Sequence, residues 1–369
     1  MLTLKKARAL AVAVLLSVSV AGIAIPATAK SLPARQRLPV PCEDVAELIK
    51  QVNEANTRGR GTIVLSSGCS YELTAPAVPD GTNGATGLPI ITGQITITGS
   101  RATITRQSAT AFRIAEVAQQ GSLTLNGITV SGGSATGGSG TVGGGILTEG
   151  TLRLVASRIT GNTASVLGGG IAVVSGATAR LAGSIVSDNR ADDGNTAGDG
   201  GGIHVGDSAR LTVQGGSIQS NTAASTGGGL ATFGTTVLGG TTVRGNRTEN
   251  FEGGGIITAF GPLTLNGGRV TGNEAATYGG GIANLGLGST LRLRNTTVDY
   301  NVSKIDGGGL YHQAGTSVLV GGRVFSNHAG GQGGGIFRVG GSVVLTGAPV
   351  VQNTPDNCAP SGDVPGCTQ

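Results

Sequence analysis

The chain has 369 residues, of which 69 are glycine, and it contains six Phe, four Tyr, one Met and no Trp. So few bulky side chains exclude a conventional globular core, because such a core needs large side chains to fill the space between its layers. Hydrophobic residues make up 38% of the chain and charged residues only 12%, which excludes a disordered, highly charged polymer. A thin core of small aliphatic side chains fits both facts.

The formal net charge of +5 includes three cations near the N-terminus, Lys5, Lys6 and Arg8. Without these three the charge is +2. The other Lys and Arg residues are scattered singly along the sequence, which gives no indication of a nucleic-acid-binding surface. We therefore expect no nucleic-acid partner.

The N-terminus has the pattern of a secretory signal. A basic stretch is followed by an apolar run from Ala9 to Ile25, and Ala27-Thr28-Ala29 forms a small-residue cleavage site. The apolar run is shorter than the roughly 20 residues of a membrane-spanning helix, so cleavage is favoured over the alternative of an uncleaved anchor. We predict that residues 1–29 are a signal peptide, and that the mature protein is secreted or at the cell surface without a membrane span.

The segment from Cys42 to Asn56 has the pattern of an amphipathic helix. Its apolar residues follow the spacing of one helix face: Val45, Leu48, Ile49 and Val52. Glu43 and Asp44 place negative charge at the start, where the helix dipole favours it. A helix at the start of a repeat protein predicts a cap that covers the apolar end.

A motif of three glycines followed by Ile or Leu recurs eight times. The triplets begin at Gly143, Gly168, Gly200, Gly227, Gly253, Gly279, Gly307 and Gly333, so the mean step is about 27 residues. Each repeat also carries a Leu-x-Leu-like pair, and then an Ile or Val three residues before an Asn. These asparagines are Asn162, Asn189, Asn221, Asn246, Asn273, Asn301, Asn327 and Asn353. Three short apolar pulses, separated by Gly, Asn, Ser and Thr, predict three short strands per repeat.

A unit of this size buries its apolar face only by coiling and stacking on the next unit. The sequence therefore predicts an all-β fold, a right-handed single-stranded parallel β-helix with three short strands per coil and a short N-terminal capping helix. We expect the cap and first coil in residues 30–92, the repeats in 93–353 and a closing tail in 354–369. Glycine suits the sharp corners, and a stack of asparagines suits a structural ladder of hydrogen bonds.

Four cysteines lie near the two ends of the predicted helix. Export to an oxidising compartment favours disulfides over free thiols. Four cysteines allow three pairings, and the sequence alone does not select one. If the two ends lie far apart, however, only neighbours reach the Cα separation of about 7 Å that a disulfide needs, which favours Cys42–Cys69 and Cys358–Cys367.

Parts of the sequence resemble known β-helix proteins. The segments at residues 42–56, 61–65 and 71–74 resemble the N-terminal cap of bacterial secreted right-handed β-helix proteins of the CSLREAI type. The repeats, with their Gly-Gly-Gly-Ile and Asn signals, resemble those of the chlamydial polymorphic outer membrane proteins. This resemblance spans about residues 42–367. It implies a surface or secreted protein, often an adhesin, and brings no shared catalytic motif.

The longest step between triplets, 32 residues from Gly168 to Gly200, gives room for an inserted loop. Acidic residues and one histidine gather in and after it: Asp188, Asp192, Asp193, Asp199, Asp207 and His204. Polysaccharide hydrolases use one carboxyl group to protonate the leaving oxygen and a second to activate water. The candidate catalytic residues are therefore Asp192, Asp193, Asp199 and His204.

The same loop has two other interpretations. Calcium binds six to eight oxygen ligands, and the oxygens that the loop offers for it belong to Asp192, Asp193, Asn195 and Asp199. Apart from calcium we expect no cofactor. The remaining interpretation is a solvated turn rich in Asp, Asn and Gly, with no role in chemistry.

A column of mostly apolar residues is expected on the outside of the helix. If the Ile or Leu after each triplet points inward, the next residue points outward. These outward residues are Leu147, Ala172, His204, Ala231, Ile257, Ala283, Tyr311 and Phe337. A continuous exposed apolar strip marks a binding surface, and a covering loop is the alternative. The binding version assigns sugar or partner contacts to Phe233, Ile257, Tyr311 and Phe337.

Two hypotheses for the function follow. The first is a non-catalytic secreted or cell-surface scaffold that binds an extracellular polysaccharide or a surface protein along one exposed sheet. The second is a polysaccharide lyase or glycoside hydrolase that uses the aspartates at positions 188–207.

Overall fold

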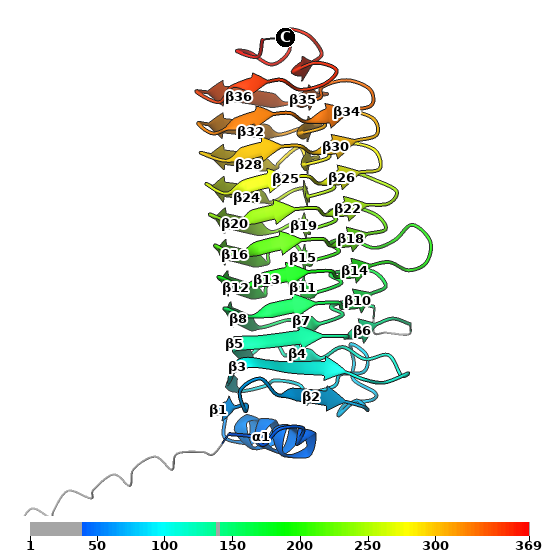
Figure 1. Cartoon of the computed structure of the whole chain (residues 1–369), viewed down its shortest axis with the longest axis vertical. Helices are drawn as coiled ribbons and strands as arrows, with labels where there is room; N and C mark the ends of the chain where they lie inside the picture. The colour runs from blue at the N-terminus through cyan, green and yellow to red at the C-terminus, as the bar shows by residue number, and fades with distance from the viewer. Residues whose placement is uncertain (1–38, 138–140, 369) are drawn as a thin grey trace, which may run out of the picture. The chain divides into compact units, whose positions relative to one another are not determined.

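The computed structural model describes residues 39–137 and 141–368, so the predicted signal peptide lies outside the described residues. Parallel strands from successive coils stack on one another, with one helix at the start of the stack and the C-terminal tail at its other end (Figure 1). The strands form three sheets of 20, eight and ten strands. We call these the large sheet, the short sheet and the triplet sheet.

The large sheet receives two strands from each regular coil, one of five residues and one of three. Its strands are β1 (Arg60–Val64), β2 (Ser70–Leu73), β3 (Gln94–Arg106), β5 (Ser122–Ser131), β8 (Thr151–Val155), β9 (Arg158–Thr160), β12 (Thr178–Ala182), β13 (Ile185–Ser187), β16 (Arg210–Gln214), β17 (Ser217–Gln219), β20 (Thr235–Gly239), β21 (Thr242–Arg244), β24 (Pro262–Asn266), β25 (Arg269–Thr271), β28 (Thr290–Arg294), β29 (Thr297–Asp299), β32 (Thr316–Val320), β33 (Arg323–Phe325), β36 (Ser342–Thr346) and β37 (Val350–Val351).

The other two sheets receive one strand per coil. The short sheet contains β6 (Ser134–Ala135), β10 (Thr163–Ala164), β14 (Arg190–Ala191), β18 (Thr222–Ala223), β22 (Arg247–Thr248), β26 (Glu274–Ala275), β30 (Val302–Ser303) and β34 (His328–Ala329). The triplet sheet, whose regular strands follow the glycine triplets, contains β4 (Ala115–Val117), β7 (Ile146–Thr148), β11 (Ile171–Val173), β15 (Ile203–Val205), β19 (Leu230–Thr232), β23 (Ile256–Thr258), β27 (Ile282–Asn284), β31 (Leu310–His312), β35 (Ile336–Arg338) and β38 (Cys358–Ala359).

The predicted fold class, a parallel β-helix, is confirmed. Three strands of each regular coil coincide with the three apolar pulses of the sequence, and a fourth strand of two residues follows the Asn. The core is a stack of aliphatic side chains: Leu152, Leu154 and Ile159 of one coil are fully buried. In register, Leu154 lies beside Leu181 of the next coil, so like side chains pack on like along the axis. This arrangement explains how a chain with so few aromatic residues builds a core.

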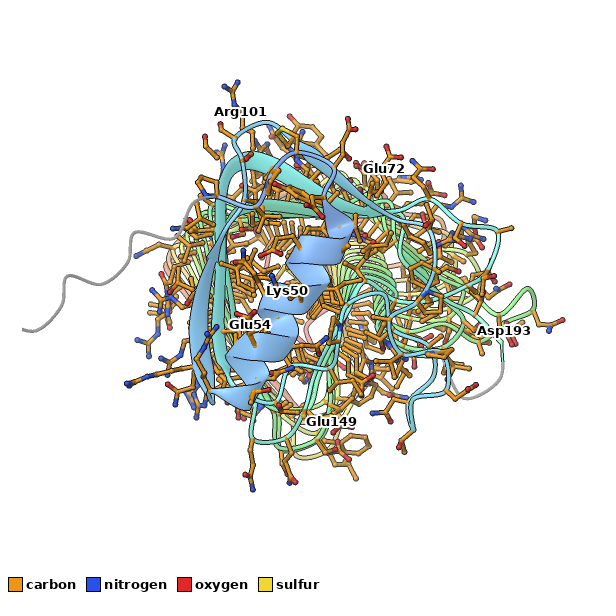
Figure 2. The ribbon with its side chains drawn as sticks, turned by 90° about the horizontal axis from the view of Figure 1, so that it is seen from below. Lys50, Glu54, Glu72, Arg101, Glu149 and Asp193 are labelled. Carbon is orange, nitrogen blue, oxygen red and sulfur yellow. A yellow bond between two sulfur atoms is a disulfide. The ribbon has the colours of Figure 1, made fainter. Side chains whose placement is uncertain are left out.

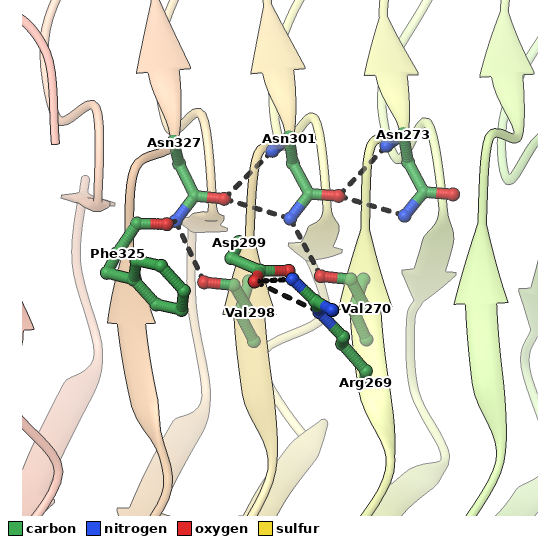
Figure 3. Close-up of polar contacts among 8 residues, drawn as sticks. All are labelled: Arg269, Val270, Asn273, Val298, Asp299, Asn301, Phe325 and Asn327. Carbon is green, nitrogen blue, oxygen red and sulfur yellow. Dashed lines mark hydrogen bonds and ion pairs between the residues drawn. The ribbon is translucent and has the colours of Figure 1, made fainter.

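The eight repeat asparagines form the predicted ladder at one corner of the stack (Figure 3). Asn273 Nδ2 donates to Oδ1 of Asn301 at 2.9 Å, and the backbone N–H of Asn273 donates to the same oxygen at 3.0 Å. Its Nδ2 also donates to the carbonyl oxygen of Val243 in the preceding coil. Because every polar group of these buried amides is paired, the ladder avoids a desolvation penalty of about 1–3 kcal/mol per unpaired group.

Each glycine of a triplet is needed for a different steric reason, as the triplet at residues 253–255 shows. Gly253 has a φ of +72°, and a Cβ there would lie 2.9 Å from Cβ of Ile257. A Cβ on Gly254 would lie 2.3 Å from the carbonyl carbon of Glu274, and one on Gly255 would lie 3.0 Å from the ladder amide of Asn273. The first glycine therefore lets the chain fold closely over the outward side chain, and the other two let coils stack.

Helix α1 (Val45–Thr57) stands at the start of the stack, and each end carries a disulfide. The helix begins after Asp44, whose side chain accepts a hydrogen bond from the backbone N–H of Glu47 at 2.9 Å. It buries Leu48 and Val52 against the first coils and thereby covers their apolar end. The disulfides Cys42–Cys69 and Cys358–Cys367 are both present, with Cα separations of 5.3 and 6.3 Å. The predicted local pairing is confirmed.

Candidate functional site

The inserted loop lies between β14 and β15, where it projects from the stack (Figure 1). Asp192 Oδ2 forms an ion pair with Arg190 at 2.7 Å, and Arg190 also pairs with Glu249 at 2.8 Å. The backbone N–H of Gly194, aided by Arg190, holds the pKa of Asp192 below its usual value. Asp192 is thus an ionised partner in a surface network.

The other candidate catalytic residues have separate structural partners. Asp193 Oδ1 accepts hydrogen bonds from the backbone N–H groups of Asn195 and Ala197 at 2.8 and 3.1 Å, which closes the turn. Asp199 Oδ1 accepts from the hydroxyl of Thr226 at 2.9 Å. Burial lowers the pKa of His204 to about 4, so its ring is neutral at neutral pH. No hydrogen bond among the described residues joins any two of the four candidates.

The positions of the four predicted calcium ligands in the loop are relevant to the calcium prediction. Asp192, Asp193 and Asn195 are neighbours in the loop, whereas Asp199 bonds to the next coil through Thr226. Among the residues that the structure describes, no group of three or more His, Cys, Asp or Glu side chains is placed to hold a metal ion. Calcium binding by this loop stays a prediction.

The predicted apolar column on the triplet sheet is present, but the chain itself covers most of it. Ile257 is 3% exposed and Tyr311 is 8% exposed, and the alanines of the column are fully buried. The cover is the segment that runs into each triplet: a Cβ added to Gly253 or Gly279 would lie 2.9 Å from Cβ of the outward residue, Ile257 or Ala283. The structure thus shows the cover that was one of the two interpretations, while ligand binding by Phe233, Ile257, Tyr311 and Phe337 stays a prediction.

The four residues predicted to bind a ligand fall into two groups. Tyr311 lies between two other rings, stacked on Tyr278 at 4.6 Å and on Phe337 at 5.8 Å between ring centroids. Its faces are therefore occupied by the chain's own rings. Phe233 and Ile257, in contrast, line an open groove of about 550 Å³.

This groove, which we call the triplet groove, lies over the middle of the triplet sheet. Its lining comprises Asp199, Ser225, Thr226, Phe233, Glu252, Ile257, Ala259, Phe260, Leu285, Gly286, Leu287, Gly288 and Gln313. The buried cluster beneath it contains Ala231, Ile257 and Ala283, against which Phe233 and Leu285 pack. The accessible apolar residues over this cluster are therefore Phe233 and Leu285, which are half-buried, while Ile257 of the column lies buried beneath them.

The outward side of the large sheet carries a second feature, which sequence reasoning missed. Every one of the seven coils from β8 to β33 exposes at least one arginine there: Arg153, Arg158, Arg180, Arg210, Arg244, Arg269, Arg292, Arg294 and Arg323. We call this surface the arginine face. Arg153 and Arg180 lie directly beside each other in register. Part of the signal in the sequence is an Arg between the two apolar residues of the Leu-x-Leu-like pair, as at Arg153, Arg180 and Arg292; the other arginines are placed on this face only by the strand pairing.

Most of these arginines have no acidic neighbour on the sheet. The one acidic residue in the strands of the arginine face is Asp299, which is fully buried and pairs with Arg269, its Oδ1 lying 2.8 Å from Nε (Figure 3). The guanidinium of Arg323 lies 3.9 Å above the ring of Phe325. No ion pair among the described residues involves Arg153 or Arg180, so their charge is available to a ligand.

Acidic side chains gather elsewhere, in the loops between the short sheet and the triplet sheet. They include Asp192, Asp193, Asp199, Glu249, Glu252 and Asp306. Seen along the stack from the α1 end, Arg101 of the large sheet and Asp193 of the inserted loop project on different sides (Figure 2). The fold thus enriches arginine on the large sheet from β8 to β33, and acidic residues in these loops, where they outnumber the basic ones.

None of the helices among the described residues is long and apolar enough to cross a membrane. No family model matches the chain, and no curated protein or solved structure matches it. The resemblance of the cap and repeats to the families named above therefore stays a prediction, whereas the parallel β-helix rests on the strand pairing itself.

Proposed function

We propose that the protein is an exported, non-catalytic β-helix scaffold that binds an acidic polysaccharide along the arginine face. The observation that carries this proposal is the exposure of arginine on seven successive coils of one sheet. The coils follow one another at about 4.8 Å, so the sheet offers at least one cation per coil along the axis, at varying positions across its two strands. A linear polymer with one acidic group on each sugar unit meets such a surface with repeated contacts.

The arginine type suits this ligand. A guanidinium group presents a planar fork of donors that matches a carboxylate or sulfate in two parallel hydrogen bonds. Threonine hydroxyls beside the arginines, such as those of Thr151, Thr178 and Thr290 at the starts of their strands, offer further hydrogen bonds to sugar hydroxyls.

A single-stranded nucleic acid fits the arginine face less well. Proteins that bind such strands combine basic grooves with exposed aromatic rings on which the bases stack. The one aromatic residue in the strands from β8 to β33 of the large sheet is Phe325, whose ring lies under Arg323. Beside it lies Tyr300, which follows β29 and is 55% exposed, with its ring edge-on to Phe325 at 5.7 Å between centroids. The surface therefore supplies the charge of a nucleic-acid site along seven coils but aromatic rings at one place only.

Calorimetry with polygalacturonate tests the proposal, with neutral dextran and single-stranded DNA as comparison ligands. We expect the protein to bind polygalacturonate, with affinity falling as salt rises. The double variant Arg153→Gln/Arg180→Gln removes two exposed charges, each worth about 0.5–1 kcal/mol, and so weakens binding roughly 5- to 30-fold. The control is Lys50→Gln/Arg58→Gln, which removes two exposed cations, one from α1 and one from the residue that caps its C-terminus.

Three outcomes would contradict the proposal: equal weakening by both double variants, binding of dextran as tight as that of polygalacturonate, or tighter binding of DNA than of polysaccharide. New reducing or unsaturated ends after incubation would instead support the enzyme hypothesis. In that case the Asp193→Asn and Asp199→Asn variants would show whether the loop is responsible.

A further inference from the structure

The triplet groove has an apolar floor and an unusually exposed apolar rim. Phe233, Ile257 and Leu285 form the floor, each from a different coil. Phe260 and Leu287 stand at the rim with 69% and 90% of their surfaces exposed. Leu287 is flanked by two glycines, and Phe260 adopts a φ of +68°, a conformation rare for a bulky residue. Large apolar side chains held in solvent beside a groove indicate a surface that contacts a ligand.

The charged groups of the triplet groove are all acidic. Asp199 and Glu252 each precede a glycine triplet and lie two coils apart on the same side. No lysine or arginine is part of the lining. Among the described residues neither carboxylate takes part in an ion pair. Burial, and to a smaller extent the charge of Asp199, raises the pKa of Glu252, which indicates a carboxylate without a compensating cation.

We propose that the triplet groove binds a peptide segment of a partner protein in which a basic side chain alternates with large apolar ones. The apolar side chains pack between Phe260, Leu287 and the floor. The basic side chain extends toward Asp199 and Glu252 and supplies the missing cation. An acidic polysaccharide is repelled by the same two carboxylates, so this site is separate from the arginine face and goes beyond the function proposed for it.

The test uses fluorescence anisotropy with three labelled peptides of equal length: one of alternating Leu and Arg, one of Leu and Glu, and one of Ser and Arg. The purified mature protein should bind the Leu/Arg peptide at least tenfold more tightly than either of the others. The variants Leu287→Ser and Glu252→Gln should each weaken that binding about fivefold to tenfold. Leu287 is 90% exposed, so its substitution leaves the core unchanged, and circular dichroism checks the folding of both variants.

Matched controls separate the groove from general effects. Val344→Ser changes an exposed valine on the large sheet, and Glu54→Gln changes an exposed glutamate of α1. Both should leave peptide binding unchanged. The Arg153→Gln/Arg180→Gln variant should also retain it, so that failure of polysaccharide binding and failure of peptide binding are seen independently.

Several results would overturn the inference. One is equal affinity for the Leu/Glu or Ser/Arg peptide, and another is unaltered binding by both groove variants. A third is concentration-dependent self-association, measured by sedimentation, that Leu287→Ser abolishes. That result would make a second copy of the chain the occupant of the groove.

Discussion

The large sheet and the triplet sheet are built from the same repeats, yet they present opposite surfaces. No other segment covers most outward residues of the large sheet, and arginines there are exposed to solvent in seven successive coils. The outward residues of the triplet sheet lie under the segment that leads into each glycine triplet, and half-buried acidic residues of that segment, such as Glu252, line the surface instead. The path of the connecting chain, more than the strands themselves, therefore decides which side chains a face of the β-helix exposes.

Glycine substitutions at the two sheets should show the largest difference in the free energy of unfolding. Gly253→Ala adds a Cβ 2.8 Å from the carbonyl oxygen of Ile256 and 2.9 Å from Cβ of Ile257, at a φ of +72°. Gly267→Ala, at a corner of the large sheet, has the same φ but nothing within 4 Å. We expect about 4 kcal/mol of destabilisation for the first, from backbone strain plus overpacking, and about 1 kcal/mol for the second, from strain alone.

Chemical denaturation followed by circular dichroism measures both variants. Equal losses of stability at the two positions would contradict the close cover that we describe for the triplet sheet.

The covered side also predicts a response to acid. Burial lowers the pKa of both His204 and His312 to about 4 from an ordinary value of 6.5. The unfolded chain therefore binds a proton at each histidine before the folded chain does, so stability is lost as pH falls from about 6.5 to about 4. The shift corresponds to about 3 kcal/mol for each residue.

Unfolding midpoints of the wild type and of His204→Phe across this pH range test the sign and size of the effect. The variant should lose roughly half of the acid destabilisation. His328→Gln, at an exposed side chain, serves as the control and should behave like the wild type. A profile unchanged by His204→Phe would contradict the prediction.

Arginines within the arginine face should differ from one another in their contribution to stability, by less than the glycines and histidines above. Arg269 pairs with the fully buried Asp299, whereas Arg153 has no ion pair among the described residues. Arg269→Gln therefore leaves a buried carboxylate without its cation and should cost about 2 kcal/mol, less than for a fully buried pair because Arg269 is itself half exposed. Arg153→Gln should leave the thermal midpoint nearly unchanged.

Thermal unfolding of the two variants side by side provides the measurement. A destabilising effect of Arg153→Gln as large as that of Arg269→Gln would show that the exposed arginines hold the sheet together, and would weaken the case for their role in binding.

The scaffold could be predicted because its signals repeat. The glycine before Ile256 and the asparagine at 273 each recur in eight repeats with similar neighbours. The close packing and the hydrogen bonds that need these residue types are therefore visible in the sequence as a repeating pattern. The disulfide pairing followed from the separation of the two ends. These features depend on local residue types that few alternatives can replace.

The surfaces could not be predicted in the same way. Arg153 and Arg180 are 27 residues apart in the sequence, and only the strand register places them side by side, whereas Arg210 of the next coil lies opposite Thr178. Burial of the predicted apolar column depends on a segment that folds back over it, which no alternation of side chains reveals. The closeness of the aspartates in the sequence likewise does not show which residues they contact. In the structure Asp192 pairs with Arg190, and Asp199 accepts a hydrogen bond from Thr226.

The asparagine ladder has a further consequence for how this architecture changes. Asn189 and Asn221 are 32 residues apart and Asn221 and Asn246 only 25, yet both pairs bond at 2.9 Å. Additional residues therefore leave the helix at one corner and return to it without shifting the register of the next coil. This corner is a tolerant insertion site, at which new loops can be grafted while the stack that carries them keeps its geometry.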